Sequence, residues 1–344
     1  MPGVDVLRLE AWLIRWRAWW YNKVPLSITL VLLLLDGRSF TFAAAAVLSL
    51  VVLTVSAVGN YGYALNELYD VEEDARAKRA NAAAALGRSR MTTIIFISSA
   101  AAVALAGAVA GLSGMALTIG AMGVTLLYSR PPWRIKERKW LGVVADALSA
   151  HVFPAALALI AVVHWDLRAP GLPLAAGILA WSAAAGLRGI LSHQLHTADR
   201  DRDGGLTTVV HDFGAPRLER FIIFVLLPIE VGGFVLGMAS CDVGWPLWTF
   251  SALYLAHEIY RTTAGGFVVT ALRPQGQPYV PFLEESYYKA WGPLFIAVDA
   301  ARIDPVFLAA LPLYWFLFRP HLVRETAKLC AVLHRIAASR RGIG

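Results

Sequence analysis

Residues 41–74 read TFAAAAVLSLVVLTVSAVGNYGYALNELYDVEED, and this stretch decides the class of fold. Its first part, Thr41–Tyr63, carries no charged side chain. A helix needs about 20 mostly apolar residues to cross the hydrocarbon core of a bilayer, so this part is long enough to span a membrane. Its second part, from Asn66 to Asp74, is rich in carboxylates. The stretch therefore predicts a membrane-spanning helix that leads into an acidic segment.

The whole chain has the composition of a polytopic membrane protein. Of its 344 residues, 58% are hydrophobic and 16% are charged, whereas soluble domains usually carry about 25% charged residues. The mean hydropathy is +0.57. Apolar runs predict spans at Trp19–Leu35, Thr41–Tyr63, Thr92–Ala110, Met115–Tyr128, Leu141–Val163, Gly171–Leu187, Phe221–Ala239 and Trp245–Tyr260, followed by a last apolar region, Ala290–Phe318. We expect an all-α, polytopic membrane bundle.

Basic residues indicate which loops share one side of the membrane. Most of the 31 Lys and Arg residues lie in the N-terminal segment and in the connections 64–91, 129–140, 188–220 and 261–289. The intervening connections hold Arg38 and Arg168. By the positive-inside rule, we expect a multi-pass protein of the cell (inner) membrane with these polar loops in the cytoplasm. The net charge of +7 then reflects topology first and an anionic ligand second, with no case for nucleic acid.

The C-terminal region leaves two alternatives open. Ala290–Phe318 is interrupted by charged residues and by Pro305, and a basic tail, 321–344, follows a transmembrane domain at 1–320. The tail should be cytoplasmic, but nine simple spans would leave it outside. Either Ala290–Phe318 crosses twice as short helices, or the tail is an exception to the rule. Its apolar spacing also allows the tail to lie on the membrane surface as an amphipathic helix.

The first acidic segment places several oxygen ligands on one side of a helix. Asn66, Asp70 and Asp74 are spaced i, i+4 and i+8, which stacks them one turn apart, and Glu67 can join the same side. Stacked carboxylates repel one another unless a cation lies between them. Mg²⁺ suits such a site because it takes one or two carboxylates and fills its other positions with water and phosphate oxygens. The alternative is a solvated helix end that the following basic residues balance.

A second acidic segment, Asp199 to Asp203, repeats the i, i+4 spacing after the sixth predicted span. It also matches the first half of a calcium-binding loop, but the twelfth position is Val210 instead of the required Glu. Each acidic segment follows an even-numbered span. The chain is therefore expected to form two four-helix halves, each of which presents one acidic segment to the same membrane face. Together they could hold two or more Mg²⁺ ions and a diphosphate.

A basic loop, YSRPPWRIK at residues 128–136, lies between the two acidic segments. Its Pro-Pro pair favours an extended turn that directs Arg130, Arg134 and Lys136 toward one region. Arg can bind phosphate in a bidentate manner, so these three cations are candidates for binding a diphosphate. The alternative is an anchor that ends the fourth span, and we favour that interpretation for Arg138 and Lys139.

Taken together, these three strings resemble the motifs of the UbiA superfamily of intramembrane prenyltransferases. The family's first motif, N-D-x-x-D-x-x-x-D, corresponds to Asn66, Glu67, Asp70 and Asp74. Its second, D-x-x-x-D followed by glycine, corresponds to Asp199, Asp203, Gly204 and Gly205. The Tyr-Ser-x-Pro-Pro loop and the segment Lys23-Val-Pro25 are similar as well. Glu67 departs from the family's Asp but keeps a carboxylate. The resemblance extends over roughly residues 10 to 318.

The resemblance implies a bundle of about nine transmembrane helices around a central cavity. It also implies a prenyl-transfer reaction. An isoprenyl group would move from its diphosphate to an aromatic or other lipophilic acceptor, with release of pyrophosphate. Mg²⁺ would be the cofactor, and an apolar groove open to lipid would hold the prenyl tail. The implied catalytic residues are Asn66, Asp70, Asp74, Asp199 and Asp203. The implied metal ligands are these five and Glu67, and the diphosphate would contact Arg130, Arg134 and Lys136. The implied partners are the donor, the acceptor and the bilayer.

Ionisable residues near the predicted spans are candidates for the acceptor site. Asp146 and His151 fall inside the fifth span, where ionisable groups are costly and are functional candidates by default. Asp146 could orient or deprotonate an acceptor, or it could serve helix packing. His193 and His196 precede Asp199 at zinc-ligand spacing, but a fourth ligand is missing, so we favour hydrogen bonds to the loop or the acceptor.

Other functions stay open at this point. A terpene cyclase on the same scaffold would capture the prenyl cation internally, and a glycosyl-type transferase would join a polyprenyl phosphate to a sugar diphosphate. A transporter would use its intramembrane charges. Against transport, the acidic residues cluster in loops instead of at mid-membrane, where transport sites usually lie.

Overall fold

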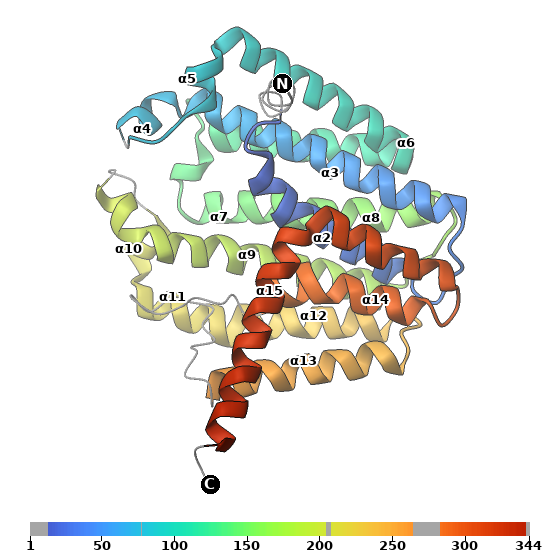
Figure 1. The fold of residues 1–344 in the computed structure, drawn as a ribbon. Helices are drawn as coiled ribbons and strands as arrows, with labels where there is room; N and C mark the ends of the chain where they lie inside the picture. The colour runs from blue at the N-terminus through green and yellow to red at the C-terminus, as the bar shows by residue number, and fades with distance from the viewer. Residues whose placement is uncertain (1–12, 77, 204–207, 264–282, 342–344) are drawn as a thin grey trace, which may run out of the picture.

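The structure is a computed structural model, which describes residues 13–76, 78–203, 208–263 and 283–341. Within these residues it contains helices and no strand (Figure 1). The α-helices are α2 (Trp16–Leu35), α3 (Phe42–Tyr69), α4 (Val71–Arg76), α5 (Ala82–Leu86), α6 (Arg88–Ser129), α7 (Trp140–Ala147), α8 (Phe153–His164), α9 (Leu172–Asp203), α10 (Val209–Phe213), α11 (Ala215–Phe221), α12 (Leu227–Ala239), α13 (Trp245–Thr263), α14 (Gly292–Ala300) and α15 (Ala310–Arg341). The expected all-α class is confirmed.

Several of these helices have the length and hydropathy of membrane spans. In the described ranges, seven qualify: Trp16–Leu35, Phe42–Tyr69, Arg88–Ser129, Trp140–His164, Leu172–Asp199, Ala215–Ala239 and Pro305–Ala327. The shorter α13 and α14 run beside them in the same bundle (Figure 1). A polytopic helical bundle is therefore confirmed, whereas the expected number of about nine spanning helices is not.

Helix α6 is a hairpin of two antiparallel segments. A straight helix of 42 residues would be about 63 Å long, roughly twice the thickness of the hydrocarbon core. The helix breaks at Ala110 and Gly111, where the glycine has φ 60° and ψ −152°. Beyond the break, a Cβ atom on Gly114 would lie 2.5 Å from the carbonyl oxygen of Ala106. The chain therefore turns back on itself between the predicted spans Thr92–Ala110 and Met115–Tyr128.

We predict that Gly111→Ala lowers the free energy of unfolding by about 1–3 kcal/mol, because only glycine adopts this backbone conformation without strain. A Cβ at this position would also lie 3.1 Å from Cε1 of His164. Gly120→Ala is the matched control, since it lies in the same helix with no atom within 4 Å of a new Cβ. Denaturant titration in detergent measures both variants. Equal stability of the two would contradict the strain argument.

The C-terminal apolar region forms two helices that pack against each other. A π-helical segment, Glu284–Trp291, continues into α14, and α15 starts after a turn at Asp304. The hydroxyl of Tyr314 donates to the carbonyl of Lys289 at 2.5 Å, so α15 runs back along this segment. The region thus folds as two helices, and the expectation that it crosses the membrane twice stays a prediction. Helix α15 deviates at Phe318, before Pro320, and continues to Arg341. The surface location of the tail 321–344 stays a prediction.

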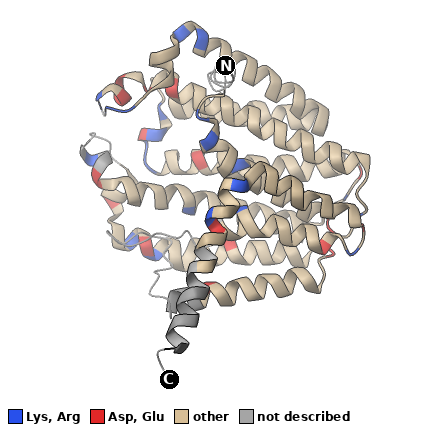
Figure 2. Cartoon of the chain, viewed as in Figure 1, with Lys and Arg blue, Asp and Glu red and all other residues tan. Residues whose placement is uncertain are grey.

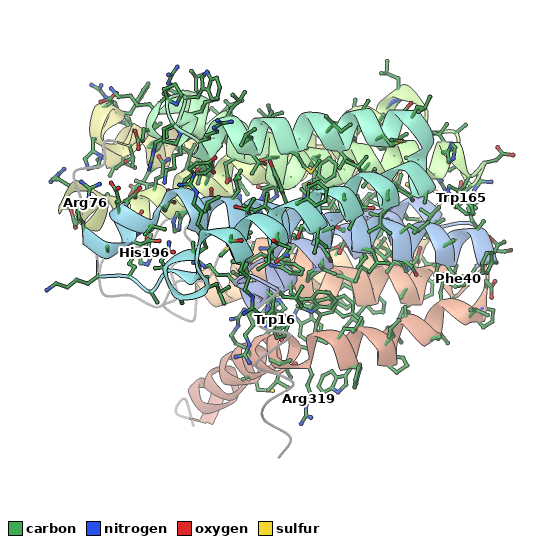
Figure 3. The ribbon with its side chains drawn as sticks, turned by 90° about the horizontal axis from the view of Figure 1, so that it is seen from above. Trp16, Phe40, Arg76, Trp165, His196 and Arg319 are labelled. Atoms are coloured by element: carbon green, nitrogen blue, oxygen red, sulfur yellow. The ribbon has the colours of Figure 1, made fainter. Side chains whose placement is uncertain are left out.

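Charged side chains gather at one end of the bundle. Figure 2 shows Lys, Arg, Asp and Glu concentrated around α4, the start of α7 and α10. Seen from above, Arg76 and His196 lie at this end, and Phe40 and Trp165 lie at the other (Figure 3). The first acidic segment follows α3 and the second ends α9, so the fold brings both to the same end, as the sequence predicts.

A buried ion pair joins α9 to α12 within the bundle. The guanidinium of Arg188 donates to Glu230 through Nε at 2.5 Å and through Nη2 at 2.7 Å. The two side chains are 1% and 0% exposed. Trp181, Phe234 and Tyr288 pack against one another in edge-on and tilted contacts in the surrounding core. The bidentate geometry holds two spanning helices in a fixed register.

Candidate functional site

The first acidic segment is built where α3 ends. Asp70 is the C-cap residue of α3, with φ −101° and ψ 7°, and α4 begins at the next residue. The backbone N–H of Asp70 donates to the carbonyl of Asn66 at 2.9 Å, and that of Asp74 donates to the carbonyl of Asp70 at 2.8 Å. The predicted one-turn spacing of the three residues is therefore kept, although the helix is interrupted between them.

The basic loop closes over this acidic segment. Lys136 Nζ lies 2.6 Å from Asp70 Oδ1 and 3.1 Å from Glu73 Oε2. Arg134 Nη2 lies 2.8 Å from the same Glu73 oxygen and 3.5 Å from Asp70 Oδ1. Two of the three predicted phosphate-binding cations thus meet the acidic segment directly. Arg130 lies apart, with its guanidinium 5.9 Å from the centre of the Trp133 ring.

The two carboxylates of this cluster respond differently to their surroundings. Burial raises the pKa of Asp70 above its ordinary value, and the charge of Lys136 offsets only part of that effect. Burial acts on Glu73 in the same direction, but Lys136 and Arg134 outweigh it, so the pKa of Glu73 is lowered. Protonation of Asp70 is thus easier than that of an exposed Asp, and the ion pairs keep Glu73 charged.

Of the other predicted ligands in the first acidic segment, Asn66 and Asp74 stay beside the cluster, whereas Glu67 turns away from it. Asn66 accepts a hydrogen bond from the Ser129 hydroxyl, and Asp74 accepts one from the amide of Asn81 at 2.8 Å. Glu67 is only 4% exposed and points away from the cluster. Its Oε2 accepts from the N–H of Ala82 at 2.5 Å, and its Oε1 lies 3.4 Å from Arg15.

The prediction that Glu67 ligates a metal therefore finds no support in its contacts. The extra methylene of Glu, compared with the family's Asp, carries the carboxylate to the start of α5 instead of toward Asp70. Glu67 joins α3 to the segment that follows α4. We leave it out of the site that we propose below.

The basic loop also reaches the side of the second acidic segment. Lys139 Nζ lies 2.5 Å from Asp212 Oδ2 on α10, and Trp140 packs edge-on against Phe213 and Phe221. Arg134 has a left-handed backbone, with φ 31° and ψ 57°. The basic loop therefore contacts the first acidic segment through Arg134 and Lys136, and Lys139 directly after it contacts α10.

The second acidic segment is described only in part. Asp199 is exposed on the last turns of α9, together with His193 and His196. Asp203 belongs to α9, but its side chain, Gly204 and Gly205 lie outside the described residues. Among the residues described, no three His, Cys, Asp or Glu side chains form a ready metal-binding group. The zinc alternative at His193, His196 and Asp199 thus finds no support.

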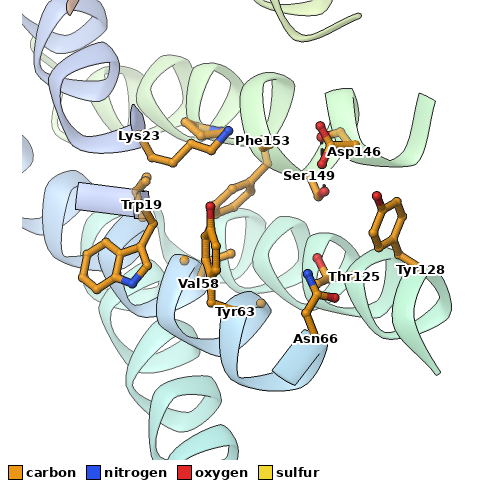
Figure 4. A pocket seen from close by; sticks show the side chains of 15 residues that line it. Trp19, Lys23, Val58, Tyr63, Asn66, Thr125, Tyr128, Asp146, Ser149 and Phe153 are labelled. Carbon is orange, nitrogen blue, oxygen red and sulfur yellow. Dashed lines mark hydrogen bonds between the residues drawn. The ribbon is translucent and has the colours of Figure 1, made fainter. Parts of the chain in front are cut away.

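A cavity of about 200 Å³ opens beneath the first acidic segment. Figure 4 shows Lys23 beside Phe153 and Trp19 beside Tyr63, with Asp146, Tyr128 and Asn66 around the rest of the space. The complete lining is Trp19, Lys23, Val55, Val58, Gly59, Gly62, Tyr63, Asn66, Thr125, Tyr128, Asp146, Ser149, Ala150, Phe153 and Pro154. Polar and apolar side chains both line the cavity, and Asn66 of the first acidic segment is one of the polar ones.

The donor set fits a divalent cation that prefers oxygen ligands. Asn66, Asp70 and Asp74 offer amide and carboxylate oxygens, and Mg²⁺ needs only one or two protein carboxylates when phosphate and water complete its shell. The ammonium of Lys136, at 2.6 Å from Asp70, is a stand-in cation at this position. A metal ion at Asp70 has to displace that ammonium, which would then be available to a phosphate.

Sequence reasoning missed several residues that the fold adds to this site. Glu73 shares both basic partners of Asp70, and its i+3 spacing from Asp70 is the signal that predicts it. Lys23, Ser149 and Tyr128 line the cavity but come from three separate elements. Lys23 and Tyr128 lie in strings that resemble the family's, but no local pattern places them in one cavity with Ser149, because the packing of distant helices brings the three together.

Comparison with known proteins identifies a sequence family and several solved structures with a similar fold. The sequence pattern of the UbiA prenyltransferase family matches residues 24–264. Two solved structures of a UbiA homolog from Archaeoglobus fulgidus are similar in fold: that bound to DMAPP and Mg²⁺ has a TM-score of 0.60, and that bound to GPP and Mg²⁺ has 0.58. Each is 18% identical and covers 85% of this chain and 98% of its own.

An apo structure of a UbiA homolog from Aeropyrum pernix K1 has a TM-score of 0.56 at 18% identity, covering 82% of this chain and 96% of its own. No curated protein sequence matches the chain significantly. At these identities the solved structures show the fold alone, and the sequence pattern shows the family.

Proposed function

The chain belongs to the UbiA prenyltransferase family, and on that premise we propose that it is a Mg²⁺-dependent intramembrane prenyltransferase. It moves an isoprenyl group from its diphosphate to an aromatic or other lipophilic acceptor and releases pyrophosphate. The observation that carries the proposal is the contact of Lys136 with Asp70, directly above a cavity that Asn66 lines. Oxygen ligands, a phosphate-binding cation and a cavity that can serve as the reaction space therefore lie next to one another.

The donor would bind at the charged end of the bundle. Asn66, Asp70 and Asp74 would hold Mg²⁺ on one side, and Asp199 and Asp203 would do so from α9. When bound, the metal neutralises the diphosphate and stabilises the negative charge that develops on it as the allylic C–O bond breaks. Structures of UbiA homologs bound to DMAPP and GPP with Mg²⁺ support this assignment.

The basic loop would bind the same diphosphate from above. Lys136 and Arg134 already contact the acidic cluster, so a small movement toward an incoming phosphate suffices to exchange one anion for another. Arg130 would join them only by leaving Trp133. The attraction between these cations and the diphosphate grows as negative charge builds on the leaving group. It therefore stabilises the transition state more than the ground state.

The cavity supports transfer to an acceptor over cyclisation. A cyclase must surround its cation with apolar and aromatic groups that exclude nucleophiles, but Lys23, Asn66 and Asp146 line this cavity. An apolar cavity of about 150 Å³ holds a benzene molecule. A volume of about 200 Å³ thus has room for a small ring beside the reacting end of the prenyl group.

The charged end of the bundle would face the cytoplasm of a cell (inner) membrane. The basic loops there follow the positive-inside rule, and the described charges concentrate at that end (Figure 2). The chain itself is an integral membrane protein by its apolar helices and its family. A water-soluble diphosphate head group would then reach the site from the cytoplasm while its tail stays in the bilayer.

Purified protein in detergent tests this function with labelled geranyl diphosphate, Mg²⁺ and an organic extract of membranes. We expect pyrophosphate release and a labelled product that contains acceptor atoms, both lost when EDTA removes the metal. Mass spectrometry identifies the product. A labelled hydrocarbon without acceptor atoms would indicate a cyclase, and a sugar-linked polyprenyl product would indicate a glycosyl-type transferase. Ion flux in vesicles without any product would indicate a transporter.

A further inference from the structure

We propose that Asp146 is the general base of the reaction, which accepts the proton that the acceptor loses as it is prenylated. The inference rests on the proposed function. It also assigns the cavity beneath the acidic segment to the acceptor.

Asp146 comes from α7 and reaches the cavity from the side opposite Tyr63. Figure 4 shows its carboxylate beside Ser149, facing a space that Tyr128 and Asn66 also border. Asn66 belongs to the first acidic segment, so one cavity joins the proposed diphosphate end to Asp146. A nucleophile held in this space would have the donor above it and a carboxylate beside it.

The Asp146 carboxylate makes no hydrogen bond that would stabilise the described part of the fold. The hydroxyl of Ser149 donates to the backbone carbonyls of Ala145 and Asp146, not to the side chain. None of the described residues donates a hydrogen bond to the Asp146 carboxylate, and Lys23 and His193 act on it through their charges. A carboxylate within a membrane-spanning segment is costly, and a structural one would be expected to have hydrogen-bond donors around it. Its oxygens are therefore available to a ligand.

Charged and titratable groups on neighbouring elements lie around this carboxylate. Lys23 of α2 and His193 of α9 act on it electrostatically. His151, from the π-helical turn Leu148–Val152, lies 3.5 Å from Lys23 through its Nε2 atom. Tyr63 of α3 and Tyr128 of α6 complete the titratable groups that line the cavity. Cationic neighbours stabilise the anion that a base must be before it takes a proton.

The chemical step balances without any further reactant. The C–O bond between the prenyl group and the diphosphate breaks, and its electron pair leaves on the pyrophosphate. A hydroxyl oxygen or an activated ring carbon of the acceptor forms the new bond to the prenyl carbon. The proton displaced from that atom moves to an Asp146 oxygen. His193 of α9 acts on Asp146 electrostatically and is itself exposed.

Asp146→Asn in the full-length protein tests the assignment, because general-base catalysis typically contributes about 10²–10⁴-fold. We expect transfer of labelled geranyl groups to the membrane extract to fall at least about 100-fold. Binding of geranyl diphosphate with Mg²⁺ should stay within about twofold, since the base does not hold the donor. Asp146→Glu should restore part of the transfer. Wild-type transfer should fall as the pH is lowered and the base is protonated, and the residual transfer by the Asn variant should lose this dependence.

Asp166→Asn is the matched control, since it makes the same chemical change at an exposed position beyond the far end of the same span. It should transfer at the wild-type rate. Transfer by Asp146→Asn within about threefold of wild type would overturn the assignment. Parallel loss of geranyl diphosphate binding would also overturn it. A wild type that binds geranyl diphosphate but transfers it to nothing would instead refute the proposed function.

Discussion

Asp70→Asn is expected to reduce prenyl transfer by about 10³-fold, the upper end of the cost of removing one electrostatic group from a transition state. Asparagine has nearly the same shape as aspartate and can still accept a hydrogen bond from Lys136, which lies 2.6 Å away. What it loses is the negative charge that a divalent cation requires. Because Asp70 lies between the acidic segment and the basic loop, the loss affects the donor's binding and its ionisation together.

Glu72→Gln is the matched control for this prediction. It removes a carboxylate two residues away, at an exposed position on α4, where none of the described residues forms an ion pair with that side chain. Its transfer should stay within about twofold of wild type. Steady-state rates at several Mg²⁺ concentrations distinguish weaker metal binding from slower chemistry. Full turnover by Asp70→Asn at ordinary Mg²⁺ concentrations would refute the proposed metal site.

Arg188→Met is expected to lower the free energy of unfolding by about 3–5 kcal/mol, because it removes the cation that neutralises the buried Glu230 carboxylate. Glu230 accepts two hydrogen bonds from Arg188 and is 0% exposed. Water cannot replace these bonds at that position. The effect should appear as an earlier transition in a denaturant titration of the protein in detergent.

The double variant Arg188→Met/Glu230→Met separates charge from packing. Replacing both members of a buried ion pair by apolar residues of similar volume is often nearly neutral, so most of the lost stability should return. Arg217→Met, at an exposed position on α11, should change stability by less than about 0.5 kcal/mol. If the double variant were as unstable as the single one, lost packing would explain the effect instead.

The class of fold and the location of the charged end could be read from the sequence. Long apolar runs such as Thr41–Tyr63 have few stable alternatives to a spanning helix, because a bilayer offers no partner for free backbone groups. The one-turn spacing of Asn66, Asp70 and Asp74 survives in the structure for a similar local reason. The basic loop also lies where its composition suggests, with Lys136 and Arg134 on the acidic cluster.

Other features of the site could not be predicted in this way. Glu67 looks like a fourth ligand in sequence, yet its carboxylate binds the N–H of Ala82. Arg130 stacks on Trp133 instead of joining Lys136. In both cases the side chain is long enough to reach either of two partners that lie on different sides of it. The choice depends on which distant segment packs nearby.

The sequence by itself determined that this chain is a helical membrane protein with two acidic segments and a basic loop at one end. These properties follow from hydropathy and from spacing along one helix, which are local. Only the tertiary structure decided that α6 is a hairpin, that Lys136 pairs with Asp70, and that Lys23 and Asp146 share a cavity with Asn66. Helices far apart in sequence meet through side-chain packing, and packing depends on all the partners at once.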